Sequence, residues 1–305
     1  MNLELIKFDN LEDIVAYNKN WDICFIGKAL DDRTKATISY SKQQARTNHV
    51  VLYDPYKLSL TIDKNEVFCH ELKGFLEKYQ NSTVLIDGTS LGVPEIGLLL
   101  SNLKNLENIT ISILYAEPGG YTANDDESDG SADSKINNRD FNLTKQLIGY
   151  QGIPQLADTL DIETPNYVVF FLGFEGYRLS LALEELNIIT KECSLVFGVP
   201  SFQPSWELNA FANNIKSINE NDLQGRVYFC GADNPAAVLK QLQELRSDIG
   251  DDQKITIVPI GTKPHSIGSL IFTAWDDHSY VLYDHPIKAN ERSKKIGSLH
   301  LYSIL

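Results

Sequence analysis

Short apolar runs alternate along this chain with longer segments in which apolar residues recur at helical spacing. Most runs are bounded by Gly, Pro, Asn or Asp, and several are apolar throughout, which is typical of strands buried on both faces of a sheet. This alternation predicts an α/β fold with mostly parallel sheets flanked by helices. We expect strands at residues 22–27, 49–54, 83–87, 109–115, 167–173, 194–199, 226–230, 254–260, 279–284 and 298–304.

The longer segments between these runs predict six helices. Pro94 and Pro235 stand at the start of two of them, where the missing N–H of proline would have no helical partner. The expected helices cover residues 65–80, 94–106, 177–187, 205–218, 235–249 and 266–275.

One polar stretch divides the pattern into two. Residues 119–140 read GGYTANDDESDGSADSKINNRD and are rich in Gly, Ser, Asn and Asp. Such a composition is typical of a loop or linker. A chain of 305 residues is long enough for two parts that each bury a core. We therefore expect two Rossmann-like halves, an N-terminal one at 1–120 and a C-terminal one at 141–305, joined by a flexible acidic loop at 121–140.

A weak internal repeat supports the division. VLIDGTSLGVPEIGLLL (84–100) resembles TIVPIGTKPHSIGSLIF (256–272), since each has an apolar strand, Gly-Thr, a turn with Pro, Ile-Gly and an apolar helix. The spacing after Gly-Thr differs by two residues. The repeat predicts one similar strand-turn-helix unit in each half.

The charge balance narrows the classes of partner. A net charge of −14 repels a nucleic-acid backbone, so we expect no general binding to DNA or RNA. No apolar run approaches the ~20 residues that cross a bilayer, and the first residues do not resemble a signal peptide. We expect a cytoplasmic protein without membrane contact.

Metal binding is not predicted. The four cysteines are far apart in sequence and no CxxC pair is present, so we interpret them as small buried hydrophobes. Residues 125–136 place acidic groups at EF-hand spacing, but Ile136 stands where a bidentate Glu is required. The acidic stretch is therefore interpreted as a solvated loop.

Ligands of open α/β sheets bind beyond the carboxyl ends of the strands, beside helix N-termini. The turn at 260–268, IGTKPHSIG, occupies that position. Gly261 allows a tight backbone, Thr262 and Ser266 supply hydroxyls, and Lys263 supplies a positive charge for a phosphate. His265 is a candidate acid or base because its ordinary pKa lies near neutrality. The alternative is an ordinary turn with a surface lysine.

Two other turns contain candidate residues. Glu175 and Arg178 in GFEGYR either pair with each other or present their charges to a ligand. Asp87, Gly88 and Thr89 follow a predicted strand and either contact a ligand or stabilise the next turn. Glu175, Asp87 and His265 are the candidate catalytic residues. Arg178, Gly88 and Thr89 join the 261–266 turn as candidate ligand-binding residues.

The common nucleotide fingerprints are absent. The chain has neither a GxxxxGK[ST] loop nor a GxGxxG after a strand, so neither a Walker nucleotide site nor an NAD site is predicted, and any cofactor stays unidentified. No GxSxG elbow is present either.

At ITIVPIGTKPHSIGSLIF (255–272) the chain resembles the CARF domains of bacterial and archaeal defence proteins. These are Rossmann-like sensors of cyclic oligonucleotides, in which a Gly-Thr-Lys turn helps to hold phosphates. The resemblance carries over to Gly261, Thr262 and Lys263, with Ser266 as a further candidate. It implies a role in bacterial defence signalling and a homodimer with the ligand on the two-fold axis. Unlike many members of that family, the chain carries no recognisable nuclease, winged-helix or protease motif.

These observations lead to one functional hypothesis and two alternatives. The hypothesis is that the chain binds a phosphate-bearing nucleotide or a nucleotide-derived small molecule. The first alternative is a hydrolase of a nucleoside or glycosyl bond that uses a carboxylate in the same cleft. A carboxylate with a raised pKa and no Arg partner would favour it. The second is a protein-interaction module without a small ligand.

Overall fold

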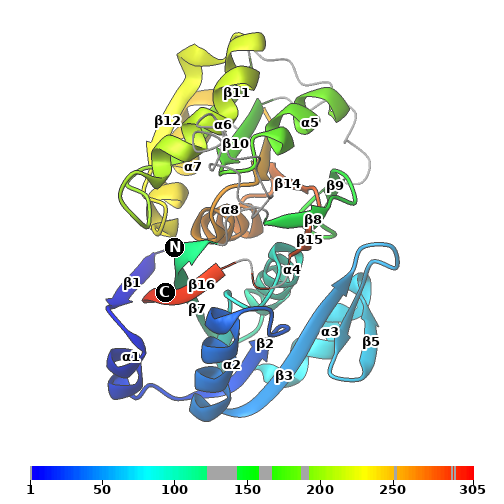
Figure 1. Ribbon diagram of the computed structural model, residues 1–305. Helices are drawn as coiled ribbons and strands as arrows, with labels where there is room; N and C mark the ends of the chain where they lie inside the picture. The colour runs from blue at the N-terminus through cyan, green and yellow to red at the C-terminus, as the bar shows by residue number, and fades with distance from the viewer. Residues whose placement is uncertain are drawn as a thin grey trace. The chain divides into compact units, whose positions relative to one another are not determined.

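The structure is a computed structural model that describes residues 2–121, 143–157, 167–186, 192–250, 253–289, 291 and 293–305. It contains two compact units (Figure 1). Unit 1 comprises Met1–Gly120, Ile153–Leu156 and Ser293–Leu305, and unit 2 comprises Tyr121–Gly152 and Ala157–Arg292. Apart from Tyr121, the predicted linker at 121–140 and its calcium-loop interpretation lie outside the described residues.

Unit 1 is built on a mixed eight-stranded sheet. Its strands, in spatial order, are β1 (Leu3–Phe8), β16 (Ser293–Ile304), β7 (Thr110–Tyr121), β6 (Thr83–Asp87), β2 (Trp21–Ile26), β3 (Ala45–Asp54), β4 (Ser59–Ile62) and β5 (Asn65–Phe68). The central pairs β7/β6, β6/β2 and β2/β3 are parallel, and the pairs β1/β16, β3/β4 and β4/β5 at the two sides are antiparallel.

Four α-helices belong to unit 1: α1 (Leu11–Tyr17), α2 (Asp32–Gln44), α3 (Leu72–Leu76) and α4 (Val93–Leu103). Short 3₁₀ turns, η1 (Cys69–Glu71) and η2 (Glu77–Tyr79), flank α3. α4 is apolar on almost every side and nearly all of its residues are buried. One core cluster packs Trp21 and Tyr40 against the apolar side chains of β2, β6, β7 and β16.

Unit 2 is built on a six-stranded sheet whose first five strands are parallel. The spatial order is β12 (Val227–Cys230), β11 (Cys193–Gly198), β10 (Tyr167–Leu172), β13 (Ile255–Pro259), β14 (Ser279–Tyr283) and β9 (Gln151–Gly152), with β9 antiparallel to β14. A separate two-stranded ladder pairs β8 (Thr144–Gln146) with β15 (Ile287–Lys288).

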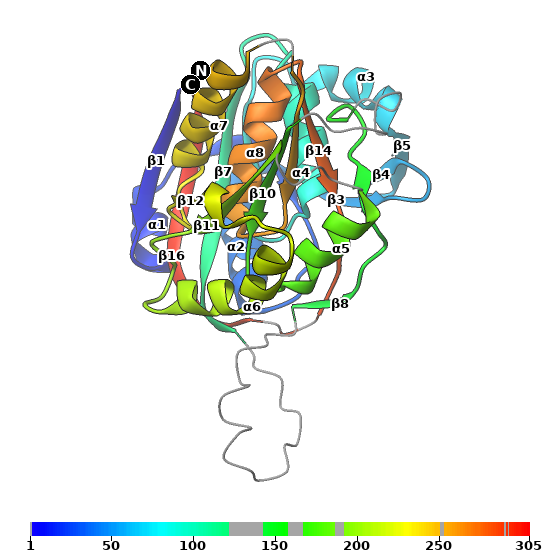
Figure 2. The same cartoon turned by 90° about the horizontal axis from the view of Figure 1, so that it is seen from above.

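Helices cover both faces of this sheet. α5 (Tyr177–Glu185) and α6 (Trp206–Glu220) pack on the face that carries Phe170 and Phe197. α7 (Pro235–Ile249) and α8 (Lys263–Trp275) lie side by side on the opposite face (Figure 2). A 3₁₀ turn, η5 (Gln224–Arg226), leads into β12.

The two units share a central strand order. In unit 1 the order β7-β6-β2-β3 matches β14-β13-β10-β11 in unit 2. In unit 1 the chain passes from β2 to β3 on one side and then returns to β6 on the other side of β2. In unit 2 it passes from β10 to β11 and then returns to β13 on the other side of β10. The strand order therefore reverses between β2 and β6 in unit 1 and between β10 and β13 in unit 2. The two segments of the sequence repeat are equivalent elements, because they form β6-α4 and β13-α8.

The predicted fold class is confirmed, since each of the ten expected strand segments overlaps a strand. The helix expected at 65–80 is wrong at its start, because residues 65–68 form β5 and pair with β4. The C-terminal half was expected to include all of 141–305. Residues 293–305 instead belong to unit 1, where Leu299–Ile304 of β16 pair with β1. No helix in the described part of the chain is long and apolar enough to cross a bilayer.

Candidate functional site

Turns that follow parallel strands of unit 2 meet at one edge of its sheet. Gly173, after β10, and Gly261, after β13, are in close backbone contact, since a Cβ on Gly173 would lie 3.2 Å from Gly261 Cα. The Thr262 hydroxyl donates to Ala232 O at 2.7 Å and ties the turn after β13 to the turn after β12. This edge contains the reversal of strand order between β10 and β13. Ligands of open α/β sheets bind beyond the strand ends at such a reversal.

The Gly261-Thr262-Lys263 turn leads directly into α8. Thr262 is the N-cap, and its hydroxyl accepts from His265 N–H at 3.4 Å. Ser266 donates its hydroxyl within the chain, to Thr262 O or Pro259 O. Within the described residues, no acceptor lies in hydrogen-bonding geometry with the N–H of Gly261 or Thr262. Of the predicted donors, the two hydroxyls are therefore used by the fold and the two backbone amides are not.

Arg178 holds the neighbouring segments in place. Its guanidinium forms a bidentate pair with Asp284, with both N–O distances at 2.6 Å, and donates to Ile260 O at 3.2 Å. Burial opposes the charge, but the Asp284 carboxylate outweighs it and raises the pKa of Arg178 above its usual range. Because Arg178 is buried and its donors are occupied, its geometry is that of a clamp between α5, the end of β14 and the Gly-Thr-Lys turn.

Glu175 lies beside this clamp. Its carboxylate is 3.3 Å from Arg178 Nη1 and accepts from the Thr144 hydroxyl at 3.0 Å. The pairing of Glu175 with Arg178 was one of the two expected arrangements. The hydrolase alternative requires a carboxylate without an Arg partner. Glu175 does not meet that condition, because it pairs with Arg178.

His265 is in the core of unit 2. Its side chain is fully buried beside the Phe171 ring, and Nε2 donates to Gly231 O at 3.0 Å. Burial lowers the pKa of His265 to about 4, so the imidazole is neutral near pH 7. A buried neutral ring held by a backbone carbonyl does not reach a ligand outside the sheet edge. The arrangement gives His265 a packing role rather than the expected acid-base role.

Asp87, Gly88 and Thr89 form the equivalent turn of unit 1. Asp87 is fully buried, and its carboxylate accepts from the N–H groups of Thr89 and Ser90, at 3.1 and 3.3 Å. The hydroxyls of Ser90 and Thr37 complete its shell, at 2.6 and 3.0 Å. Burial raises the pKa of Asp87. Asp87 has a raised pKa and accepts no bond from an Arg, yet every acceptor oxygen is already occupied, so its geometry is structural.

The repeat places Ile260 of unit 2 where unit 1 has Asp87. Each residue directly precedes Gly-Thr at the end of a central strand. In unit 1 the Asp87 carboxyl group accepts hydrogen bonds from the backbone N–H groups of Thr89 and Ser90. Ile260 is apolar and cannot do so. The turn of unit 2 therefore lacks the carboxyl acceptor that its counterpart contains.

Three aromatic side chains form a cluster that includes Phe174, the residue after Gly173. The ring of Phe174 lies 5.6 Å from that of Tyr121 and 5.8 Å from that of Trp206, and the last two are 5.0 Å apart. All three are partly exposed. Sequence reasoning missed this cluster. The available signal was an aromatic residue in two of the predicted turns, GFEGYR and GVPSFQPSW.

The comparisons with family models and with curated sequences give no relative from which to infer a role. Neither a protein-family model nor a curated protein sequence matches this chain. The functional conclusion therefore depends on the geometry of the two turns.

Proposed function

We propose that unit 2 binds a phosphate-bearing nucleotide, or a small molecule derived from one, at the turn formed by residues 260–263. The observation that carries this proposal is the contrast between the turns. The N–H groups of Gly261 and Thr262 have no acceptor among the described residues, whereas in unit 1 the N–H of Gly88 donates to Ile86 O and the N–H groups of Thr89 and Ser90 donate to Asp87. An external anion would take the place of that carboxylate.

The physical chemistry of the turn suits a phosphate. It stands at the N-terminus of α8, where the helix dipole favours negative charge. Each hydrogen bond from an amide to a phosphate oxygen is worth about 1.5–3 kcal/mol. Lys263 stands at the first position of the helix and adds a positive charge on a flexible stem.

The aromatic cluster suits the rest of such a ligand. Phe174 follows Gly173, whose backbone contacts Gly261, so the aromatic cluster begins one residue from a backbone neighbour of the proposed phosphate site. Stacking of a base on an aromatic ring contributes about 1–3 kcal/mol and tolerates any base. The resemblance to CARF domains points to the same ligand class, with cyclic oligonucleotides as the first compounds to test. Binding of such a ligand on a two-fold axis would require a homodimer.

The decisive experiment transfers the unit 1 carboxylate to unit 2. Adenosine monophosphate, cyclic di-AMP and cyclic tetra-adenylate are titrated into wild type, Ile260→Asp and the matched control Ile260→Val by calorimetry. Ile260→Asp supplies an internal acceptor and a like charge, so we expect loss of at least a hundredfold in affinity, about 2.7 kcal/mol. Ile260→Val should bind as wild type does. Equal affinity of Ile260→Asp and wild type would contradict the proposal, provided that thermal melting shows both to be folded.

The same titrations address the alternatives. A hydrolase would convert one of the three titrated compounds to products, and that turnover would be lost in Glu175→Gln. An interaction module would bind none of the three compounds. Binding without turnover is the result that the proposal requires.

A further inference from the structure

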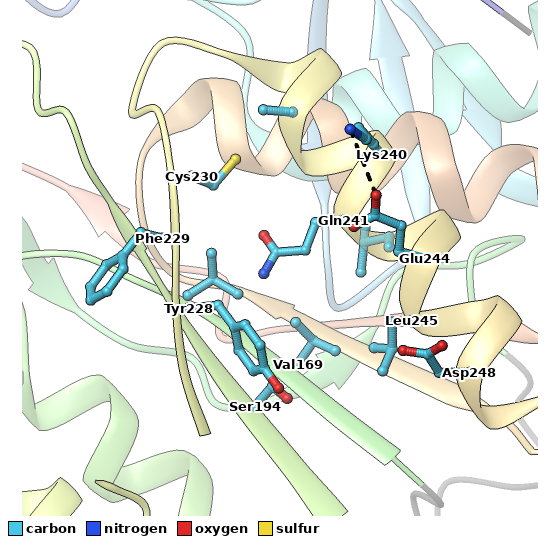
Figure 3. A pocket seen from close by; sticks show the side chains of 13 residues that line it. Val169, Ser194, Tyr228, Phe229, Cys230, Lys240, Gln241, Glu244, Leu245 and Asp248 are labelled. Atoms are coloured by element: carbon cyan, nitrogen blue, oxygen red, sulfur yellow. Dashed lines mark ion pairs between the residues drawn. The ribbon is translucent and has the colours of Figure 1, made fainter. Parts of the chain in front are cut away.

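A cavity in unit 2 lies apart from the strand-end turns. It has a volume of about 400 Å³ and lies between α7 and the sheet face formed by β10, β11 and β12 (Figure 3). Val169, Val196 and Leu242 are buried and form part of an apolar lining. Sites for small molecules typically measure roughly 300–1,000 Å³ and have mostly apolar walls. The cavity therefore has the size and lining of a small-molecule site.

The topology of the sheet explains why a cavity exists there. The sheet has five parallel strands, which at a spacing of about 4.8 Å are about 24 Å wide. Two helices packed about 10 Å apart cover roughly 20 Å of that width. Because α7 packs on α8, which lies over β13 and β14, the uncovered strip falls at the β12 edge. The cavity follows from the strand order and is not an accident of one side chain.

Two polar side chains define what the cavity would bind. Tyr228 on β12 contributes to the wall and is 48% exposed, so its ring is available for contact. Gln241 extends from α7 over the sheet, and its Oε1 is buried without a hydrogen-bond donor in the described part of the chain. A half-turn of the side-chain amide exchanges Oε1 with Nε2 and presents the oxygen to the cavity. A buried acceptor without a partner destabilises the fold, and a bound N–H group would remove that cost.

The rim of the cavity determines the charge of the occupant. Lys240 pairs with Glu244 at 3.7 Å, as the dashed line in Figure 3 shows, and Asp248 stands one turn further along α7. The rim thus carries one positive and two negative charges, on a chain whose net charge is −14. An anion would be repelled, and this separates the cavity from the proposed phosphate site.

We propose that the cavity between α7 and the β12 edge binds a planar aromatic small molecule, uncharged or cationic, that donates an N–H hydrogen bond to Gln241. The ring of this ligand packs between Tyr228 and the apolar floor. The site is independent of the Gly261-Thr262-Lys263 turn, because none of those residues lines it.

A matched pair of fluorescent probes tests the proposal. N-phenyl-1-naphthylamine is uncharged and carries one N–H, and 8-anilinonaphthalene-1-sulfonate has the same rings and N–H with an added sulfonate. The uncharged probe should bind the folded protein at one site per chain, at least tenfold more tightly than the sulfonate. Equal or tighter binding of the sulfonate would overturn the proposal.

Substitutions then locate the bound probe. Tyr228→Ala and the cavity-filling Ala237→Leu should each weaken binding of N-phenyl-1-naphthylamine at least tenfold, and Gln241→Leu about fivefold. The matched controls are Gln243→Leu, an exposed glutamine on the same helix, and Tyr56→Ala, an exposed tyrosine of unit 1. Both controls, and Lys263→Ala, should leave the affinity unchanged. If Tyr228→Ala and Ala237→Leu melt as wild type does and still bind the probe fully, the cavity is not the site.

Discussion

The two Gly-Thr turns have the same place in their sheets and opposite electrostatic arrangements. In unit 1, Asp87 is buried and its oxygens accept four hydrogen bonds from Thr37, Thr89 and Ser90. In unit 2, Ile260 offers no acceptor, and α8 begins directly after Thr262 instead of three residues later. The unit 1 turn contains an internal acceptor for its amides, and the unit 2 turn leaves the N–H groups of Gly261 and Thr262 without an acceptor among the described residues. One strand order thus supports turns with and without an internal acceptor.

The largest effect should come from removing the internal anion of unit 1. Asp87→Ala leaves four donors without their acceptor and should lower the free energy of unfolding of unit 1 by about 4 kcal/mol, at about 1 kcal/mol each. Urea denaturation followed by Trp21 fluorescence, in a Trp206→Phe/Trp275→Phe background, measures it. Asp32→Ala, at an exposed helix position, serves as the control. A loss below 1 kcal/mol would show that the carboxylate does not stabilise the turn.

The next effect concerns the buried imidazole behind the open turn. Folding favours the neutral form of His265, so the stability that it contributes is present above pH 6.5 and is lost as the pH falls towards 4. A lowering of the pKa from 6.5 to about 4 corresponds to about 3 kcal/mol. The free energy of unfolding of unit 2, measured with urea between pH 7 and 4, should therefore change less with pH in His265→Gln than in wild type. His278→Gln, at an exposed histidine, should keep the wild-type slope.

A smaller effect is expected at Lys263, which follows Gly-Thr in unit 2 where unit 1 has the uncharged Ser90. Lys263→Ala should weaken binding of a phosphate-bearing ligand about tenfold, or about 1.4 kcal/mol, and the difference should shrink as salt is added. Calorimetry at low and high ionic strength measures it. Lys216→Ala removes an exposed lysine from α6 and is the matched control. An unchanged affinity would remove Lys263 from the site and leave the amides alone to explain binding.

The smallest effect is expected from replacing the threonine of each Gly-Thr turn, Thr262 in unit 2 and Thr89 in unit 1. Thr262→Val removes the N-cap of α8 and should destabilise unit 2 by about 1 kcal/mol. Thr89→Val removes the acceptor of Ala116 N–H, 2.9 Å away, and should affect unit 1 alone. Hydrogen exchange of the two units distinguishes these outcomes. If both substitutions destabilised the same unit, the threonines would not have the separate structural roles described here.

The strands were predictable because burial on both faces makes them apolar, as in Phe170-Phe171-Leu172. Segment 65–80 was misread because Phe68, Leu72 and Leu76 recur at helical spacing, although pairing with β4 decides the conformation of its first residues. The helix α2 was missed because its buried positions are largely polar, among them Thr34 and Thr37. Pairing with β4 overrode the local pattern in the first case, whereas α2 does carry a local signal, the capping box of Asp31 and Thr34.

The position of the candidate site was predictable, and its bonding was not. A Gly-Thr turn after an apolar strand indicates a strand end, and strand ends are where ligands bind. By contrast, Arg178 and Asp284 are 106 residues apart and their pairing depends on the sheet order. The burial of His265 likewise depends on how α8 packs. The sequence distinguishes neither a clamp from a ligand contact nor a core histidine from a catalytic one.

The position of β16 has a consequence for synthesis of the protein. This strand lies between β1 and β7 inside the sheet of unit 1, yet all the residues of unit 2 up to 292 precede it in the chain. During translation, unit 2 can be complete while unit 1 still lacks an interior strand. The ribosome therefore makes most of unit 1 early, and the interior strand β16 only after unit 2. Folding from the N-terminus onward, the usual order for successive domains, is not open to unit 1.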